Sequence, residues 1–220
     1  RFDEGYGLNP RALELLAQQG VTLIITVDCG ASASAEVSYA HELGLDVVVT
    51  DHHSVPTSLP AALAIINPKR DDSRYPCRDL SGAGVAFKLL QALYQELAPD
   101  MSLDPCLDLV ALGTVADIVP LLGENRYLVK SGLERLNQAP RLGLTELMLR
   151  SGSQPEAIDA DRLSWVLAPR LNAAGRLDHA MTSYKLLTTA DPEEALELAA
   201  ELEETNSRGR ALTQQVFESA

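Results

Sequence analysis

Asp46-Val-Val-Val-Thr-Asp-His-His53, preceded by Val21-Thr-Leu-Ile-Ile-Thr-Val-Asp28, decides the fold of this chain. Each stretch is an apolar run of strand length that ends in acidic or imidazole side chains. Between them, the Ala- and Ser-rich residues 31–43 predict a helix that Gly44 terminates. Two strands joined by a helix and short loops predict a βαβ unit with a right-handed crossover. We therefore expect an α/β fold with a parallel sheet.

The polar residues that end both strands should meet at one edge of the sheet. Neighbouring strands lie about 4.8 Å apart, and the metal ions of dinuclear sites lie about 3.5–4 Å apart. Asp28 from the first strand, with Asp51, His52 and His53 from the second, therefore suits a dinuclear metal site. The pattern favours a metal-dependent hydrolase. A polar loop at the sheet edge is the alternative that the residues alone leave open.

A further pair of acids frames the segment Asp108-Leu-Val-Ala-Leu-Gly-Thr-Val-Ala-Asp117. Asp117 ends a predicted helix and can point out of the core into a cleft, which makes it a candidate ligand. Asp108 lies near the N-terminus of that helix, where a carboxylate stabilises the helix dipole, and we expect this role for it. Carboxylates and imidazoles together suit Mn²⁺, Mg²⁺, Fe²⁺ or Zn²⁺. Such ions bind phosphate oxygens and activate water.

The rest of the chain is expected to be mainly helical. A helix is predicted from Asn9-Pro10 to Gln18, and a short strand at residues 64–67. Further helices are expected near residues 82–97, 104–116, 126–138, 144–150, 159–168 and 180–189, with a last one from Asp191-Pro192 that breaks near Gly209. The predicted fold class is a parallel sheet flanked by helices, with a mostly helical C-terminal half.

Composition and charge limit the classes of function that the chain can have. A net charge of −13 over 220 residues argues against a general basic surface for nucleic acid. Arginines between residues 141 and 176 leave room for a local basic face, although surface arginines are commonly just solvated. The three cysteines form no CxxC pair, and the sequence holds neither a signal segment nor an apolar run of about 20 residues. We therefore expect a cytoplasmic location.

Motifs along the whole chain point to one family. They are Arg1-Phe-Asp-Glu-Gly-Tyr-Gly-Leu8, Thr26-Val-Asp-Cys-Gly30, Val49-Thr-Asp-His-His53, Ile65-Ile-Asn-Pro68, Gly82-Ala-Gly-Val-Ala-Phe87, residues 108–121 and Ala168-Pro-Arg-Leu-Asn-Ala-Ala-Gly-Arg-Leu177. The chain resembles the catalytic core of the RecJ-type single-strand-specific exonucleases, within the DHH phosphoesterase superfamily. The Asp-His-His triplet marks the superfamily, and the Pro-Arg-Leu-Asn-Ala-Ala-Gly-Arg stretch points to the RecJ type within it.

The resemblance implies a domain organisation and an activity. Residues 1–190 would form a partial DHH catalytic domain whose first motif precedes residue 1, and residues 191–220 would begin a helix leading to a further C-terminal domain. The implied activity is 5′-to-3′ hydrolysis of single-stranded DNA with two Mn²⁺ or Mg²⁺ ions, in DNA repair and recombination. The implied partners are single-stranded DNA, single-strand-binding protein and a helicase.

Site roles also follow from the resemblance. Asp28, His52 and Asp117 would be metal ligands, with Asp28 bridging the two ions. His53 would face the scissile phosphate, and Asp51 would orient the histidines, so these two residues form the catalytic pair.

Contacts with DNA are implied for Arg170, Asn172 and Arg176, which would bind phosphates near the site.

Two other functions stay open. A DHH phosphodiesterase for cyclic dinucleotides or short oligonucleotides would share the metal ligands but should lack the Pro-Arg-Leu-Asn-Ala-Ala-Gly-Arg stretch. A non-catalytic scaffold of the same fold would tend to lose ligands.

Overall fold

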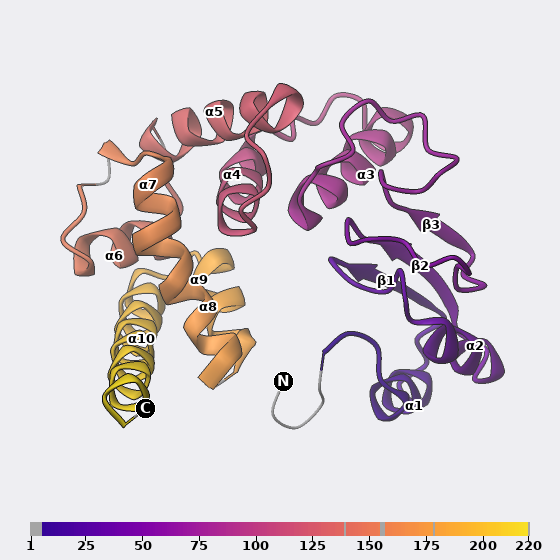
Figure 1. Ribbon diagram of the computed structural model, residues 1–220. Helices are drawn as coiled ribbons and strands as arrows, with labels where there is room; N and C mark the ends of the chain where they lie inside the picture. The colour runs from indigo at the N-terminus through magenta and orange to yellow at the C-terminus, as the bar shows by residue number, and fades with distance from the viewer. Residues whose placement is uncertain (1–5, 139, 155–156, 178, 220) are drawn as a thin grey trace. The chain divides into compact units, whose positions relative to one another are not determined.

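The computed structural model describes residues 6–138, 140–154, 157–177 and 179–219, and the side chains of 176, 177 and 219 lie outside that description. The chain divides into two units, Arg1–Leu128 and Val129–Ala220, and each is described by itself (Figure 1). The domain boundary predicted at residue 190 marks the end of the catalytic domain that the resemblance implies, and it remains a prediction. Among the described residues, no helix combines the length and the apolar character that crossing a membrane requires.

Three parallel strands form the sheet of the first unit. They are β1 (Leu23–Val27), β2 (Asp46–Thr50) and β3 (Ala64–Ile66), arranged in the order β1-β2-β3. The register pairs Val27 with Thr50 and Thr50 with Ile66, so the carboxyl ends of all three strands lie together. The predicted βαβ unit and the α/β class are confirmed, with each strand end within two residues of its predicted position.

Helices α1 (Pro10–Gln18) and α2 (Ser34–Glu42) cover one face of the sheet. Asn9 caps α1, because its side-chain oxygen accepts a hydrogen bond of 2.9 Å from the N–H of Ala12. The core on this face consists of buried side chains from both helices, from β2 and from the residue before it: Leu13, Val37, Ala40, Leu45, Val47 and Val49. The burial of Val47 and Val49 follows from the alternation of side chains along a strand.

Helix α3 (Gly82–Leu97) packs against β1, β2 and α4 (Leu107–Ala116). A short 3-10 turn, η1 (Asp104–Cys106), precedes α4, and α5 (Gly123–Gln138) follows it. The second core of this unit consists of Leu80, Val85, Phe87, Val110 and Leu128, with Ile66 of β3 packed against it. Ile65 of β3 packs against the first core, and Ile66 packs against the second. Helices therefore cover both faces of the sheet, as is usual for parallel sheets.

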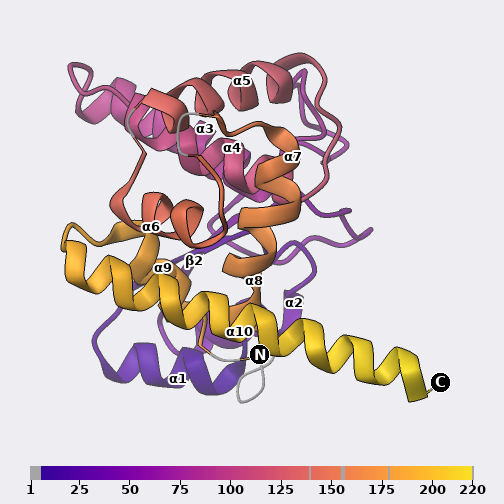
Figure 2. The same ribbon diagram turned by 90° about the vertical axis from the view of Figure 1, so that its left-hand side faces the viewer.

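Helices and the loops between them make up the second unit, and its described residues contain no strand. It contains α6 (Leu142–Arg150), α7 (Ala160–Arg162), a π-helical turn η3 (Leu163–Leu167), α8 (Ala168–Leu177), α9 (Ala180–Thr188) and α10 (Pro192–Ser219). Helix α10 contacts α6, α8 and α9, and in Figure 2 α6 and α9 lie beside its first half.

Two expectations about this unit are wrong. The helix predicted near residues 159–168 does not end there, because the helical run continues to residue 177 as α8. Pro169 lies inside a continuous helical run from residue 160 to residue 177, directly after the π-helical turn η3, in which the N–H of Ala168 bonds the carbonyl of Leu163. The break near Gly209 does not occur, and α10 is continuous. A single interior glycine costs only about 1 kcal/mol, which a long packed helix can absorb.

Candidate metal centre

The pairing of the strands extends one residue beyond them and places two acids side by side. The N–H of Asp28 donates to the carbonyl of Thr50 at 3.0 Å, and the N–H of Asp51 donates to the carbonyl of Ile66 at 3.0 Å. Asp28 then leaves the strand direction with a φ of 64°, a left-handed conformation that aspartate tolerates better than most residues. The predicted meeting of the polar residues at one sheet edge is therefore confirmed.

His52 lies at the centre of this edge, between two carboxylates. Its Nε2 is 3.0 Å from Oδ1 of Asp28 and 3.2 Å from Oδ2 of Asp117. These contacts have ion-pair distances without hydrogen-bond alignment, and among the described residues neither ring nitrogen of this buried imidazole has a hydrogen-bond partner. The carboxylate of Asp28 raises the pKa of His52, against the opposing effect of burial.

Asp117 follows directly on the last residue of α4, where its N–H still donates to the carbonyl of Gly113 at 3.0 Å. Burial raises the pKa of this half-buried carboxyl group, and His52 opposes the rise. The helix end thus turns the side chain back toward the sheet edge, as expected. Asp108, at the opposite end of α4, is buried in its first turn, as expected of an acid that stabilises the helix dipole.

Asp51 is buried and ties the loop after β2 together. Its Oδ2 accepts from the N–H of Ala31 at 2.9 Å, and its Oδ1 accepts from the N–H groups of His52 at 2.8 Å and His53 at 3.1 Å. Oδ1 also lies 2.7 Å from Nδ1 of His53. Burial alone would raise the pKa of Asp51, but the hydrogen bonds outweigh burial and lower it. Since an ionised carboxylate only accepts, Nδ1 of His53 carries the proton, and Nε2 of the neutral ring is an acceptor.

The residues at this edge fit a divalent metal ion. Asp28, His52 and His53 each offer one ligand atom, and these atoms lie within 4.8 Å of one another. His52 supplies a buried nitrogen for which the described residues offer no hydrogen-bond partner, and a buried polar atom of that kind is costly unless a ligand satisfies it. Carboxylate and imidazole donors together suit Mn²⁺ or Mg²⁺. The ligand roles of Asp28, His52 and Asp117 remain proposals, which the geometry supports.

Asn67 belongs to this site, although the sequence reasoning did not assign it a role. It is buried directly after β3, its Nδ2 donates to the carbonyl of His53 at 3.0 Å, and its Oδ1 accepts from the N–H of Lys69 at 2.8 Å. Asn67 therefore holds the loop that carries the two histidines. The signal was present, because Asn67 ends a strand in the same way as Asp28 and Asp51 do.

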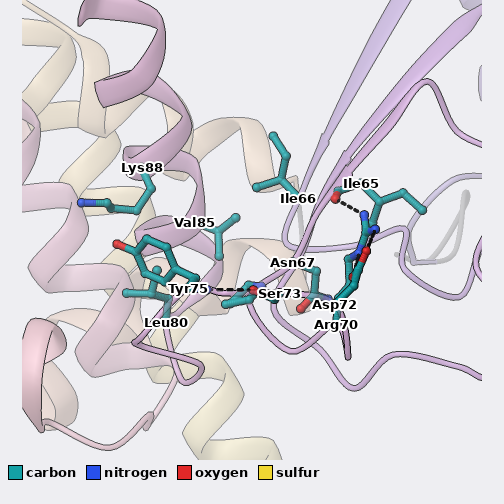
Figure 3. A pocket seen from close by; sticks show the side chains of 11 residues that line it. Ile65, Ile66, Asn67, Arg70, Asp72, Ser73, Tyr75, Leu80, Val85 and Lys88 are labelled. Atoms are coloured by element: carbon teal, nitrogen blue, oxygen red, sulfur yellow. Dashed lines mark hydrogen bonds and ion pairs between the residues drawn. The ribbon is translucent and has the colours of Figure 1, made fainter.

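Asn67 also lines a pocket of about 360 Å³ beside β3 (Figure 3). Its wall carries two cations, and both are paired. Arg70 donates to Asp72 at 2.7 and 2.9 Å, and Lys88 donates to Glu124 at 2.9 Å. The pocket therefore contrasts with the edge around His52, whose two imidazole nitrogens have no hydrogen-bond partner among the described residues.

The residues predicted to contact DNA belong to the second unit. Arg170 of α8 is mostly buried, and its guanidinium pairs with both carboxylate oxygens of Glu203 on α10 and donates to the carbonyl of Val166 at 2.8 Å. Asn172 is exposed. Arg176 lies in α8, but its side chain is outside the described residues. The pairing of Arg170 with Glu203 was not foreseen, because these residues are 33 positions apart.

Comparison with known proteins identifies relatives of this arrangement. A family model described as "DHH family, N-terminal domain" matches residues 3–114. The single-stranded-DNA-specific exonuclease RecJ of Bacillus subtilis (strain 168) is 45% identical over 220 residues, which are 100% of this chain and 27% of that protein. The exonuclease of the same name from Escherichia coli (strain K12) is 41% identical, covering 97% of this chain and 39% of that protein. The chain thus spans less than half the length of these relatives.

Solved structures of RecJ have the same fold. A crystal structure of exonuclease RecJ bound to manganese matches with a TM-score of 0.86 and 36% identity, covering 100% of this chain and 55% of that chain. RecJ in complex with Mn²⁺ from Thermus thermophilus matches with a TM-score of 0.84 and 34% identity, covering 97% of this chain and 32% of that chain. The match confirms the predicted sheet with its flanking helices.

The hydrogen bonds of Asp51 predict a pH-dependent loss of stability in Asp51→Asn. An amide has one acceptor oxygen, so at least one of the N–H groups that face the carboxylate loses its partner. We expect the free energy of unfolding at pH 7 to fall by about 1–3 kcal/mol, measured by urea denaturation. Because the pKa of Asp51 is lowered in the folded state, its stabilisation is complete above the ordinary carboxyl pKa and is lost as the pH falls through the lowered value.

The difference between the wild type and Asp51→Asn should therefore shrink in acid. Asp46→Asn is the matched control, since Asp46 is an exposed aspartate at the start of β2, the strand that Asp51 follows, and its substitution should change stability little. A difference between the wild type and Asp51→Asn that stays constant from pH 7 into the acid range would contradict the assignment.

Proposed function

Because the chain belongs to the DHH family, we propose that it forms the catalytic core of a metal-dependent phosphodiesterase that degrades single-stranded DNA from the 5′ end. The observation that carries this proposal is His52, a buried imidazole that has no hydrogen-bond partner in the described part of the chain and lies 3.0 Å from Asp28 and 3.2 Å from Asp117. The names of the relatives supply the substrate, since each is a single-stranded-DNA-specific exonuclease.

Two divalent ions, Mn²⁺ or Mg²⁺, are the proposed cofactors. Their support is the donor set of Asp28, His52 and Asp117, which lie in contact with one another around the imidazole, together with the similar RecJ structures that were solved in complex with Mn²⁺ or Mg²⁺. Asp28 would help to hold the ions, and its half-exposed carboxylate at the open side of the sheet edge is accessible to them. When bound, such ions neutralise charge on the phosphate and activate water.

His53 and Asp51 are the proposed catalytic pair. The His53 side chain is half exposed, and its Nδ1 is held by Asp51, so Nε2 is directed to whatever occupies the site. Hydrolysis forms a bond from a water oxygen to phosphorus, breaks the bond to the leaving oxygen and delivers a proton to it. We assign to His53 the position that faces the scissile phosphate, and to Asp51 the fixing of its tautomer, which leaves Nε2 as a proton acceptor on that side. Asn67 restrains the same loop through the carbonyl of His53.

Arg170, Asn172 and Arg176 are the proposed DNA-binding residues. Two arginines on one helix with an exposed asparagine suit contacts to successive phosphates. Arg170 would share its guanidinium between Glu203 and a phosphate, because an arginine fork has five N–H donors. Single-strand-binding protein and a helicase remain predicted partners. A cytoplasmic location and a role in repair and recombination also remain predictions.

Loss of the Asp28 carboxylate should separate catalysis from binding in the intact protein. Asp28→Asn keeps the shape and tolerates a φ of 64°, but it removes the charge that would hold the metal. We expect hydrolysis of a 5′-labelled linear strand to fall by more than about a hundredfold. Affinity for the strand, measured without turnover, should change little because phosphate contacts dominate it.

The substrates used in this assay also decide between the alternatives. The wild type should shorten a linear strand from its 5′ end and leave a circular strand and a cyclic dinucleotide intact. Rapid hydrolysis of the cyclic dinucleotide with no action on linear DNA would favour the small-molecule phosphodiesterase. No hydrolysis of any substrate with Mn²⁺ or Mg²⁺ would favour the non-catalytic scaffold.

Arg170→Ala combined with Arg176→Ala should weaken binding to single strands of any sequence. If each arginine binds one phosphate, the slope of log K against log salt should become shallower by about 0.7 for each phosphate that is no longer bound. The measurement is a titration of labelled single-stranded DNA at several salt concentrations.

Glu203→Gln is the matched control, because it removes the charge that pairs with Arg170 and leaves both arginines in place. It should alter thermal stability without making the salt slope shallower. An unchanged slope in the double arginine variant would show that Arg170 serves only the packing of α8 against α10.

A further inference from the structure

Gly82, the first residue of α3, lies directly against the carboxylate of Asp28. A Cβ at this position would lie 2.4 Å from Oδ1, 2.5 Å from Cγ and 2.6 Å from Cβ of Asp28. Carbon atoms in good contact are about 3.5–4.0 Å apart. No residue except glycine can therefore occupy position 82 while the side chain of Asp28 keeps its place.

The helix start around Gly82 is held on both sides and cannot easily retreat. The Ser81 hydroxyl accepts from the N–H of Gly84 at 3.0 Å and forms a buried hydrogen bond of 2.9 Å with the hydroxyl of Thr114 on α4. Ala83 packs so closely on α4 that a Cβ at Gly113 would lie 2.5 Å from its own Cβ. A side chain at position 82 would therefore displace Asp28 before it displaced α3.

The contacts of this turn with α4 involve the residues that precede Asp117. Thr114 and Gly113 lie three and four positions before it, and the Asp117 N–H is bonded to the carbonyl of Gly113 at 3.0 Å. The start of α3 thus contacts Asp28 through residue 82 and the end of α4 through residues 81 and 83. It links the two carboxylates on either side of His52.

We propose that Gly82 is a positioning residue of the metal centre, and that its missing side chain sets the place of the Asp28 carboxylate beside His52, where both would hold the metal. The part of this inference that concerns metal rests on the proposed function. The part that concerns the contact between Gly82 and Asp28 is independent of it.

The test compares Gly82→Ala with Gly84→Ala in the intact protein. Gly84 is buried in the same helix turn, but its added Cβ would meet neighbours no closer than 3.4 Å, an ordinary contact. Calorimetry with Mn²⁺ should show about 10–100-fold weaker binding for Gly82→Ala, the range found when groups that orient ligands are removed. Gly84→Ala should bind within about twofold of the wild type. Equal Mn²⁺ affinity of the wild type and folded Gly82→Ala overturns the proposal.

A double-mutant cycle with Asp28→Gly tests the contact itself through the melting temperature. Asp28→Gly removes all three atoms that the new Cβ would meet, and glycine suits a φ of 64°. Gly82→Ala should lower the melting temperature of the wild type, or prevent its folding, and have little effect in the Asp28→Gly background. The same loss in both backgrounds would place the cost within the helix and overturn the proposal. A wild type that binds no Mn²⁺ would refute the proposed function, while the cycle would still decide on the contact.

Discussion

The parallel pairing of β1 with β2 is the constraint on which the candidate site depends. The ladder continues past both strands, so that the N–H of Asp28 bonds the carbonyl of Thr50 and the N–H of Asp51 bonds that of Ile66. These two bonds fix where the chain leaves the sheet. A slip of one residue would turn every side chain of a strand to the opposite face, and His52 would then no longer meet Asp28. The buried Val47 and Val49 oppose such a slip, since it would bring them to the other face.

The electrostatics of the site depend on the hydrogen-bond donors that surround each carboxylate. Asp51 is buried, but it accepts hydrogen bonds from three backbone N–H groups and from His53, which favours its charged form. Asp28 and Asp117 have no comparable set of donors among the described residues, and both face His52. Carboxylates that share a site repel one another unless a cation or a proton intervenes. A divalent ion would remove that repulsion and satisfy the imidazole as well.

Much of this arrangement could be predicted from the sequence because it depends on local patterns. Apolar runs of strand length ending in Asp28 and in Asp51 gave the sheet, the edge and the meeting of Asp28 with His52. Asn67 follows the same pattern but was overlooked, since β3 is a strand of only three residues. Gly82 could not be recognised, because its role depends on a contact with a residue 54 positions earlier in the chain, and glycine before a helix is common. The predicted helix ended before Pro169, whereas the helical run continues past this proline into α8 after a π-helical turn. The pairing of Arg170 with Glu203 depends on tertiary packing alone.

The central claim is that the sheet edge around His52 is a metal site, and a crystal structure with Mn²⁺ tests it most directly. Anomalous scattering locates manganese without reference to the protein atoms. Density for manganese in contact with Nε2 of His52 and with carboxylate oxygens of Asp28 and Asp117 is the predicted result. Crystals grown in millimolar Mn²⁺ that show no anomalous density at this edge, or show it only at other residues, would contradict the account.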